Sequence, residues 1–211
     1  MIRSHLLVLA KSPLPGRVKT RLCPPFDLDQ AAELAEAALA DTLAAVVATG
    51  AERKLLALDG PTGPWVPEGV EVFPQRGGGL DERLAWAWER AGGPGLQIGM
   101  DTPQVDAALL ESGLELLLSS GTGSVLGHAA DGGWWAIGLR RPDPGVFLGV
   151  PMSTSVTGVA QERRLRERGL RPGRLPTLRD VDDISDAEAV AELAPDTRFA
   201  RAYRGLAVPA R

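Results

Sequence analysis

Four cations gather in one short segment near the start of the chain. They are Lys11, Arg17, Lys19 and Arg21, in a chain whose formal net charge is −4. This local reversal of sign suits a small phosphorylated ligand. Prolines stiffen the segment and Gly16 lets the backbone approach a ligand, so the cations can converge on phosphate oxygens and stabilise the charge on a departing diphosphate. An exposed basic surface loop is the alternative, and charge alone favours neither interpretation.

The pair Lys19-Thr20 superficially matches the end of a Walker A motif. The first glycine that the motif requires is missing, and prolines occupy the loop. We therefore reject a P-loop NTPase.

A carboxylate, Asp101, follows the apolar run at 97–100. Ligands of open α/β sheets bind beyond the carboxyl ends of the strands, so a residue directly after a strand is a candidate for the site. A carboxylate there can hold Mg²⁺ or Mn²⁺, which bridges nucleotide phosphates and keeps several waters. A turn-forming Asp before Thr102-Pro103 is the commoner role, and the motif alone is a weak signal.

A run of acidic residues spans 180–186. Its spacing superficially suggests an EF-hand, but Ser185 stands at the obligatory glycine position and Ala191 at the terminal glutamate position, so that calcium loop is excluded. We favour helix capping for Asp183 and Asp186. Asp182 could instead supply a second ligand to a metal held by Asp101.

The segment Asp131-Gly132-Gly133-Trp134-Trp135 is a candidate for binding a sugar or other acceptor. Two glycines permit close backbone approach, and a tryptophan can stack on the ligand. Because side chains alternate across a strand, one Trp must point toward the core, and we expect this to be Trp135.

The elements that position these residues alternate between strand and helix. Short apolar runs predict strands at 6–10, 54–58, 70–73, 95–100, 124–129, 134–139 and 174–178. Helical spacing predicts helices from Asp27 or Asp29 to Gly50, around 80–88, after 103 to 118, at 156–168 and after the 180–186 run. This order predicts a three-layer α/β/α sandwich with a mostly parallel sheet and one antiparallel strand.

Length and composition set the class of protein. The chain has 211 residues, 44% hydrophobic and 24% charged, which is ordinary for a globular domain and predicts a single domain over 1–211. One cysteine, Cys23, cannot form an internal disulfide, which fits a reducing compartment. The chain has only two histidines, His5 and His128, which disfavours a mechanism or a metal site built on histidine.

The same features exclude several partners. The basic residues are not spread along a face with aromatic platforms, so we expect no nucleic-acid binding. The apolar run at 6–10 is too short for a membrane span or a signal peptide, so we expect a cytoplasmic protein that does not bind membranes. Homo-oligomerisation is left open.

Four segments, in chain order, resemble one bacterial family. They are Leu-Ala-Lys-Ser-Pro-Leu-Pro-Gly-Arg-Val-Lys-Thr-Arg-Leu at 9–22, Gly-Met-Asp-Thr-Pro at 99–103, Asp-Gly-Gly at 131–133 and Asp-Val-Asp at 180–182. Over nearly the whole chain this resembles the DUF2064 transferases, also described as radical-SAM/selenodomain-associated transferase 1 proteins. The first motif is long and specific. More distantly, the layout is similar to that of molybdenum-cofactor guanylyltransferase and phospholactate guanylyltransferase.

The resemblance implies a GT-A-like nucleotide-diphospho-sugar transferase fold and a role for each motif. It implies that Lys11, Arg17, Lys19 and Arg21 meet the nucleotide phosphates and that Asp101 and Asp182 hold Mg²⁺ or Mn²⁺. Gln75 and the turn at 77–80 would lie near the base or acceptor, with Arg83 reaching toward the site. From the motifs and the resemblance together we expect Arg17, Lys19 and Asp101 to carry catalysis, Gly16 to join the nucleotide site, and Asp131, Gly132, Gly133 and Trp134 to bind the acceptor.

The chain departs from the family pattern at three places. Asp81 follows Leu80 where glycine is frequent, and Trp134 follows Asp-Gly-Gly where tyrosine is frequent. Met152, in Pro-Met-Ser-Thr at 151–154, stands where the family often has the tryptophan of Pro-Trp-Ser-Thr. These departures suggest a specialised acceptor pocket.

The leading hypothesis is metal-dependent nucleotidyl transfer from an NTP to a small phosphorylated or phosphonate acceptor, with release of pyrophosphate. Glycosyl transfer from a nucleotide sugar is the chief alternative, because it uses the same metal and diphosphate site. A non-catalytic nucleotide-binding protein is the third. Retention of both aspartates and the basic loop argues against the third.

Overall fold

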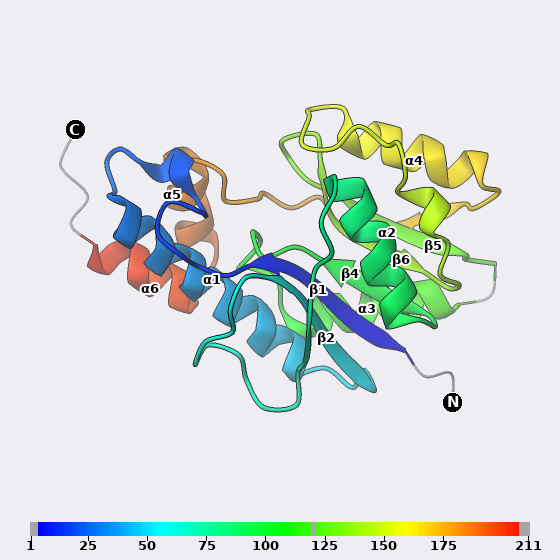
Figure 1. Cartoon of the computed structure of the whole chain (residues 1–211), viewed down its shortest axis with the longest axis horizontal. Coiled ribbons are helices and arrows are strands. Elements are labelled where there is room, and N and C mark those ends of the chain that lie inside the picture. The colour runs from blue at the N-terminus through cyan, green and yellow to red at the C-terminus, as the bar shows by residue number, and fades with distance from the viewer. Residues whose placement is uncertain (1–3, 120, 207–211) are drawn as a thin grey trace.

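The apolar runs form the strands of one sheet in the computed structural model, which describes residues 4–119 and 121–206 (Figure 1). The strands are β1 (His5–Lys11), β2 (Arg53–Asp59), β3 (Glu71–Pro74), β4 (Gly95–Ile98), β5 (Ser124–His128), β6 (Trp134–Leu139) and β7 (Pro172–Arg174). Their order in the sheet is β3-β2-β1-β4-β6-β5-β7. β6 is antiparallel to its neighbours β4 and β5, and the other pairs are parallel, which confirms the mostly parallel sheet.

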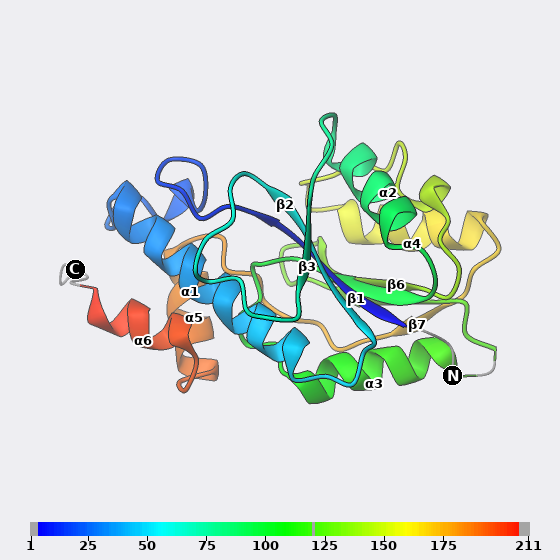
Figure 2. The ribbon, with the colours of Figure 1, turned by 60° about the horizontal axis from the view of Figure 1, so that its bottom comes forward.

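Helices cover both faces of this sheet. They are α1 (Leu28–Val47), α2 (Leu80–Ala91), α3 (Ala107–Leu118), α4 (Thr157–Glu167), α5 (Ile184–Leu193) and α6 (Arg198–Gly205), with short 3₁₀ helices at Thr20–Leu22 and Pro144–Val146. α1 and α3 lie on one face, whereas α2 and α4 lie on the other (Figure 2). The predicted three-layer α/β/α architecture is confirmed.

The alternation of side chains along β1 divides the core between the two faces. Leu6 and Val8 pack into the layer of α1 and α3, and Leu7 packs into the layer of α2 and α4. A third cluster joins the outer side of α1 to α5 and α6, with Leu34 and Phe199 buried. β1 is therefore buried on both faces, and the loop that follows it starts from a rigid strand.

Two predicted elements differ from those observed. The strand expected at 174–178 ends at Arg174, and beyond it only an isolated bridge joins Leu178 to Ala129 within the described residues. Pro176 interrupts the ladder there because it has no N–H to donate, and its carbonyl accepts instead from the Trp135 indole at 2.9 Å.

The C-terminal helix is two helices rather than one. Pro195 follows the end of α5, and Thr197 caps α6 by accepting from Ala200 N. The Asp41 carboxylate of α1 accepts from Arg198 N and Phe199 N at 3.0 and 2.8 Å, which ties the start of α6 to α1. Within the described residues, the helices are all too short or too polar to cross a membrane.

Candidate functional site

The loops that leave the carboxyl ends of β1, β3 and β4 border a cavity of about 810 Å³. This is the position at which open α/β sheets bind ligands. Most residues that the sequence singled out line it: Lys11, Arg17, Lys19, Arg21, Gln75, Arg83, Asp101, Asp131, Gly133 and Trp134, together with Asp182. Segments far apart in the chain thus meet in one place.

The acidic and basic motifs meet at Lys19. Its ammonium contacts Asp101 Oδ1 and the Val181 carbonyl oxygen and lies 3.8 Å from Asp182 Oδ1. Arg21 Nη1 lies 3.5 Å from Asp182 Oδ2. Because one ammonium group reaches both carboxylates, Asp101 and Asp182 face the same point although 81 positions separate them.

Burial and like charge raise the pKa values of two carboxyl groups beside this point. Burial is the main cause of a pKa of about 7 for Asp180, and the charges of Asp101, Asp131 and Asp182 add to it while Lys19 opposes them. Burial likewise raises the pKa of Asp182, with Lys19 as the largest opposing influence. The carboxylates therefore lie in a crowded negative region that favours a bound cation.

The basic loop takes its shape from two residues in the left-handed region. Gly16 has φ +75°, where glycine meets no steric penalty. Lys19 has φ +50° and ψ +31°, which is uncommon for a residue with a side chain. Lys19 then begins a 3₁₀ turn at Thr20–Leu22, whose Leu22 is fully buried. Buried Leu22 anchors this turn and so fixes the direction from which the Lys19 side chain enters the cavity.

Asp59, at the end of β2, positions two arginines. Its carboxylate oxygens lie 3.5 Å from Arg17 Nη2 and 3.8 Å from Arg83 Nη1. Gln75 holds Arg83 from the other side, because its Oε1 accepts from Arg83 Nη1 at 3.3 Å. The Gln75 amide donates to the carbonyls of Ala10 and Ala57, so Gln75 links the strand ends to Arg83. Arg83 Nε is buried without a partner in the described residues.

The Asp-Gly-Gly turn is held against the start of α4. Asp131 Oδ1 accepts from Gly133 N at 2.8 Å, and Gly158 N donates to the Gly132 carbonyl at 2.8 Å. A Cβ at Gly132 would overlap the Ser155 carbonyl, so this position requires glycine for packing. Neither Gly132 nor Gly16 lines the cavity; each shapes the backbone of its loop.

The two tryptophans differ in burial as expected, although both border the cavity. Trp135 is 2% exposed and belongs to the core. Trp134 lines the cavity, and its indole N–H is buried without a partner among the described residues. A buried donor without a partner costs free energy, so a ligand that accepts from Trp134 would gain from it.

Sequence reasoning did not select two residues of this site, Asp59 and Asp180. Both line or support the cavity: Asp59 pairs with the arginines and Asp180 lies beside the carboxylates. Asp59 directly follows an apolar strand, the same signal that singled out Asp101. Asp180 stood in the acidic run, but nothing in its spacing distinguished it from the residues that cap a helix.

The chemistry of the carboxylates fits a divalent cation. No group of three or more His, Cys, Asp or Glu side chains in residues 4–119 and 121–206 could hold a metal by itself. Mg²⁺ needs less from the protein, because one or two carboxylates, substrate phosphates and waters complete its shell. Asp101 and Asp182, already sharing one cation, are such a pair.

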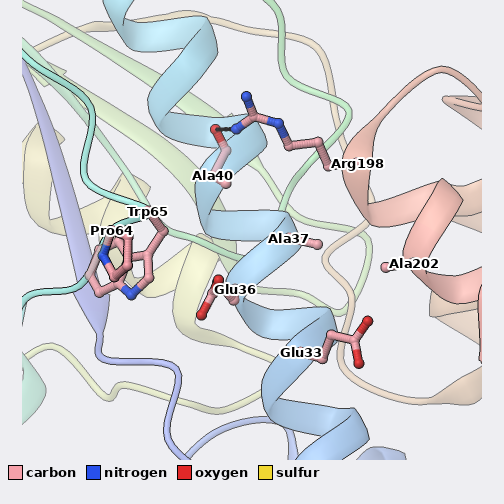
Figure 3. Close-up of a pocket in the computed structure, with 8 residues that line it drawn as sticks. All are labelled: Glu33, Glu36, Ala37, Ala40, Pro64, Trp65, Arg198 and Ala202. Atoms are coloured by element: carbon pink, nitrogen blue, oxygen red, sulfur yellow. Dashed lines mark hydrogen bonds between the residues drawn. The ribbon is translucent and has the colours of Figure 1, made fainter.

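A second hollow of about 410 Å³ lies between α1, the loop that carries Trp65, and α6 (Figure 3). Glu33 and Glu36 line it from α1, and Arg198 donates to the Ala40 carbonyl at 3.4 Å (Figure 3). Its carboxylates are exposed, and it lies on the α1 side rather than at the strand ends. It brings together none of the motifs of the cavity.

Comparison with known structures shows the class of fold. A candidate nucleotide-diphospho-sugar transferase from Desulfovibrio desulfuricans G20 is 24% identical, with a TM-score of 0.87 over 97% of this chain and 95% of that one. CMP:2-keto-3-deoxy-manno-octonic acid synthetase complexed with CTP gives 12% identity and a TM-score of 0.59, covering 97% and 100%. The fold is that of the nucleotide-diphospho-sugar transferases.

A third structure, 2-C-methyl-D-erythritol 4-phosphate cytidylyltransferase from Thermus thermophilus, is 17% identical with a TM-score of 0.55, covering 92% of this chain and 100% of that one. The chain belongs to the family DUF2064, described as an uncharacterized protein conserved in bacteria, whose model matches residues 31–154. No curated protein sequence matches the chain. The family match contains Asp101 and the Asp-Gly-Gly turn, while the basic loop and Asp182 lie outside it.

Proposed function

We propose that this protein transfers a nucleotidyl group from an NTP to a small phosphorylated or phosphonate acceptor and releases pyrophosphate, with Mg²⁺ or Mn²⁺. The observation that carries the proposal is the meeting of Lys19 with Asp101 and Asp182 at the carboxyl end of the sheet. Phosphoryl-group transfer needs positioning and charge neutralisation rather than covalent catalysis, and the cavity supplies both signs of charge.

In this reaction an oxygen of the acceptor phosphate attacks the α-phosphorus, and the bond from that phosphorus to the bridging oxygen of the β-phosphate breaks. Pyrophosphate leaves with the electron pair. The acceptor phosphate is already an anion, so no dedicated general base is needed. Arg17, Lys19 and Arg21 line the cavity, with Lys11 at the end of β1, and would stabilise the charge on pyrophosphate.

Each remaining group has a separate task. Asp59 and Gln75 hold Arg83 at the cavity wall, where its guanidinium can meet a phosphate or the acceptor. Trp134 would bind the acceptor by donating from its indole N–H, which has no partner among the described residues. The turn at Asp131 would lie beside the acceptor. A divalent ion held by Asp101 and Asp182 would neutralise the phosphates and orient the α-phosphorus.

Two neighbours in fold support this choice, since by name one is complexed with CTP and the other is a cytidylyltransferase. The high TM-score to the candidate nucleotide-diphospho-sugar transferase supports a second possible function, glycosyl transfer from a nucleotide sugar. That reaction breaks the anomeric bond instead and releases a nucleoside diphosphate. The same cations would stabilise either leaving group.

The test is a product assay with the full chain. Four NTPs and a panel of nucleotide sugars are each incubated with phosphorylated and phosphonate acceptors and Mg²⁺ or Mn²⁺. We expect pyrophosphate and a nucleotidylated acceptor in equal amounts. Nucleoside diphosphate from a nucleotide sugar would replace the proposal by glycosyl transfer. Nucleotide binding without turnover over the whole panel would favour a binding protein. Asp101→Asn serves as the inactive variant, and Arg171→Ala, outside the cavity, as the control.

A further inference from the structure

The ammonium of Lys19 lies at the two carboxylates that we propose as metal ligands. The Lys19 side chain is only 9% exposed, and its ammonium touches Asp101 Oδ1 and the Val181 carbonyl, with Asp182 Oδ1 at 3.8 Å. Carboxylate and carbonyl oxygens are also the ligands that hard divalent cations prefer. The nitrogen therefore sits among oxygen atoms that form a cation site.

The backbone supports this placement. Lys19 takes a left-handed conformation that residues other than glycine rarely adopt, and such strain persists where the surroundings hold it. The adjacent turn is anchored by buried Leu22 on one side and by Val18, 7% exposed, on the other. Lys19 is thus directed into the cavity, whereas Arg21 contacts Asp182 from solvent with a side chain that is 78% exposed.

The Lys19 ammonium and a metal ion would compete for these oxygens. Two cations at one pair of carboxylates repel each other and compete for the same lone pairs. When a metal occupies the pair, the flexible four-carbon chain of Lys19 must carry its charge elsewhere in the cavity, and the nearest new anion would be a nucleotide phosphate.

We propose that Lys19 is a built-in competitor for the metal: its ammonium holds Asp101 and Asp182 together in the nucleotide-free protein and moves to a phosphate oxygen when metal and nucleotide bind. The inference rests on the proposed function, because it takes these carboxylates as the metal ligands. Metal alone then binds weakly, since the competent state is only fractionally populated. Nucleotide draws Lys19 away and strengthens metal binding, and metal strengthens nucleotide binding by the same factor.

The first test measures Mn²⁺ affinity without nucleotide, by electron paramagnetic resonance of the free ion, in wild type, Lys19→Met and Arg21→Met. Both substitutions remove one positive charge near Asp182, but only Lys19 occupies the site. We expect Lys19→Met to bind Mn²⁺ at least about tenfold more tightly than wild type and Arg21→Met to change affinity much less. Equal gains in both variants would reduce the effect to general charge and overturn the proposal, as would no gain in Lys19→Met.

A second test uses the wild-type protein and does not depend on a variant that folds. The chain has three lysines, Lys11, Lys19 and Lys54. Acylation of each by an amine-reactive reagent is followed by mass spectrometry with and without Mg²⁺. We expect Mg²⁺ alone to speed modification of Lys19 severalfold relative to Lys11 and Lys54, because its ammonium is released. An unchanged Lys19 rate at saturating Mg²⁺ would overturn the proposal.

These outcomes distinguish a failure of the competition by Lys19 from a failure of the proposed nucleotidyl transfer. If wild type turns over with metal but Lys19 neither competes nor becomes reactive, the competition is wrong and nucleotidyl transfer stands. If neither wild type nor Lys19→Met binds metal, with or without NTP, the assignment of Asp101 and Asp182 as metal ligands fails, and the competition fails with it.

Discussion

The acidic run at 180–186 divides into two halves that use the same residue type in opposite ways. In the first half, Asp180 and Asp182 lie at the cavity with raised pKa values. In the second half, Asp183 and Asp186 also border the cavity, but their carboxylates accept backbone N–H groups. Asp183 Oδ1 accepts from Asp186 N at 3.0 Å, and Asp186 Oδ2 accepts from Asp183 N at 3.2 Å, which confirms the predicted cap of α5. The pKa of Asp183 is lowered, chiefly by that backbone bond.

The two halves are adjacent in the chain and use the same side chain, so they differ in the groups that contact their carboxylates. A carboxylate that receives N–H groups at a helix start stabilises the fold. A carboxylate that faces other carboxylates and a single shared ammonium is held at a cost, and such crowding marks a site for ligands.

The largest effect is expected from the cavity half. Asp182→Asn or Asp101→Asn should lower kcat/KM for nucleotidyl transfer by about 100-fold or more, the scale of losing one contact to developing charge. The Tm of the nucleotide-free Asp182→Asn protein should stay the same or rise, because burial and like charge disfavour its ionised form. Steady-state pyrophosphate release and thermal unfolding measure the two quantities.

The matched control for that prediction is Asp183→Asn, in the other half of the run. Asn is as good an N-cap as Asp, so both activity and stability should remain close to wild type. If Asp183→Asn lost as much activity as Asp182→Asn, the division of the run into a site and a cap would be wrong.

An intermediate effect is expected at the basic loop. Arg17→Ala should weaken nucleotide binding by about 10-fold or more, because a charge-assisted hydrogen bond contributes roughly 1.5–3 kcal/mol. Stability should hardly change, since the Arg17 side chain is 54% exposed and its ion pair with Asp59 is long. Titration calorimetry with NTP gives the affinity, with Arg171→Ala as the comparison. Equal affinity in the two variants would remove Arg17 from the site.

The smallest effect concerns the cap and depends on pH. Asp183→Ala should lower the free energy of unfolding by about 1 kcal/mol at pH 7 with activity retained. Since the folded-state pKa of Asp183 lies below its ordinary value of 3.8, this contribution is complete above pH ~4 and is lost as pH falls through the lowered pKa. Urea unfolding of both proteins between pH 7 and 3 should show a constant gap that narrows only at the acid end. A gap that widens in acid would contradict the assignment.

Sequence patterns predicted the elements well where hydrophobic period and capping agree. Asp27 accepts from Gln30 N at 2.8 Å and starts α1, one of the two positions that the pattern allowed. The strand at 174–178 was placed wrongly, because the decisive contact joins Pro176 to Trp135, which lies 41 positions away. Such pairings carry no local signal.

The site residues were likewise predictable only where a local sequence signal marked them. The rule that ligands bind beyond strand ends located Asp101 and would have located Asp59, which also ends a strand. No spacing rule could show that Gln75 is occupied by the carbonyls of Ala10 and Ala57, nor that Lys19 reaches Asp182, 163 positions later. These contacts depend on how the loops fold back over the sheet.

Calorimetric binding of an NTP to wild type and Asp101→Asn, each with Mg²⁺ and with a chelator, tests the proposed nucleotide site most directly. If the cations and carboxylates form one nucleotide site, wild type binds NTP tightly with Mg²⁺ and at least about tenfold more weakly without it, and Asp101→Asn loses that difference. NTP affinity that is the same in all four titrations, or no binding in any, would contradict it.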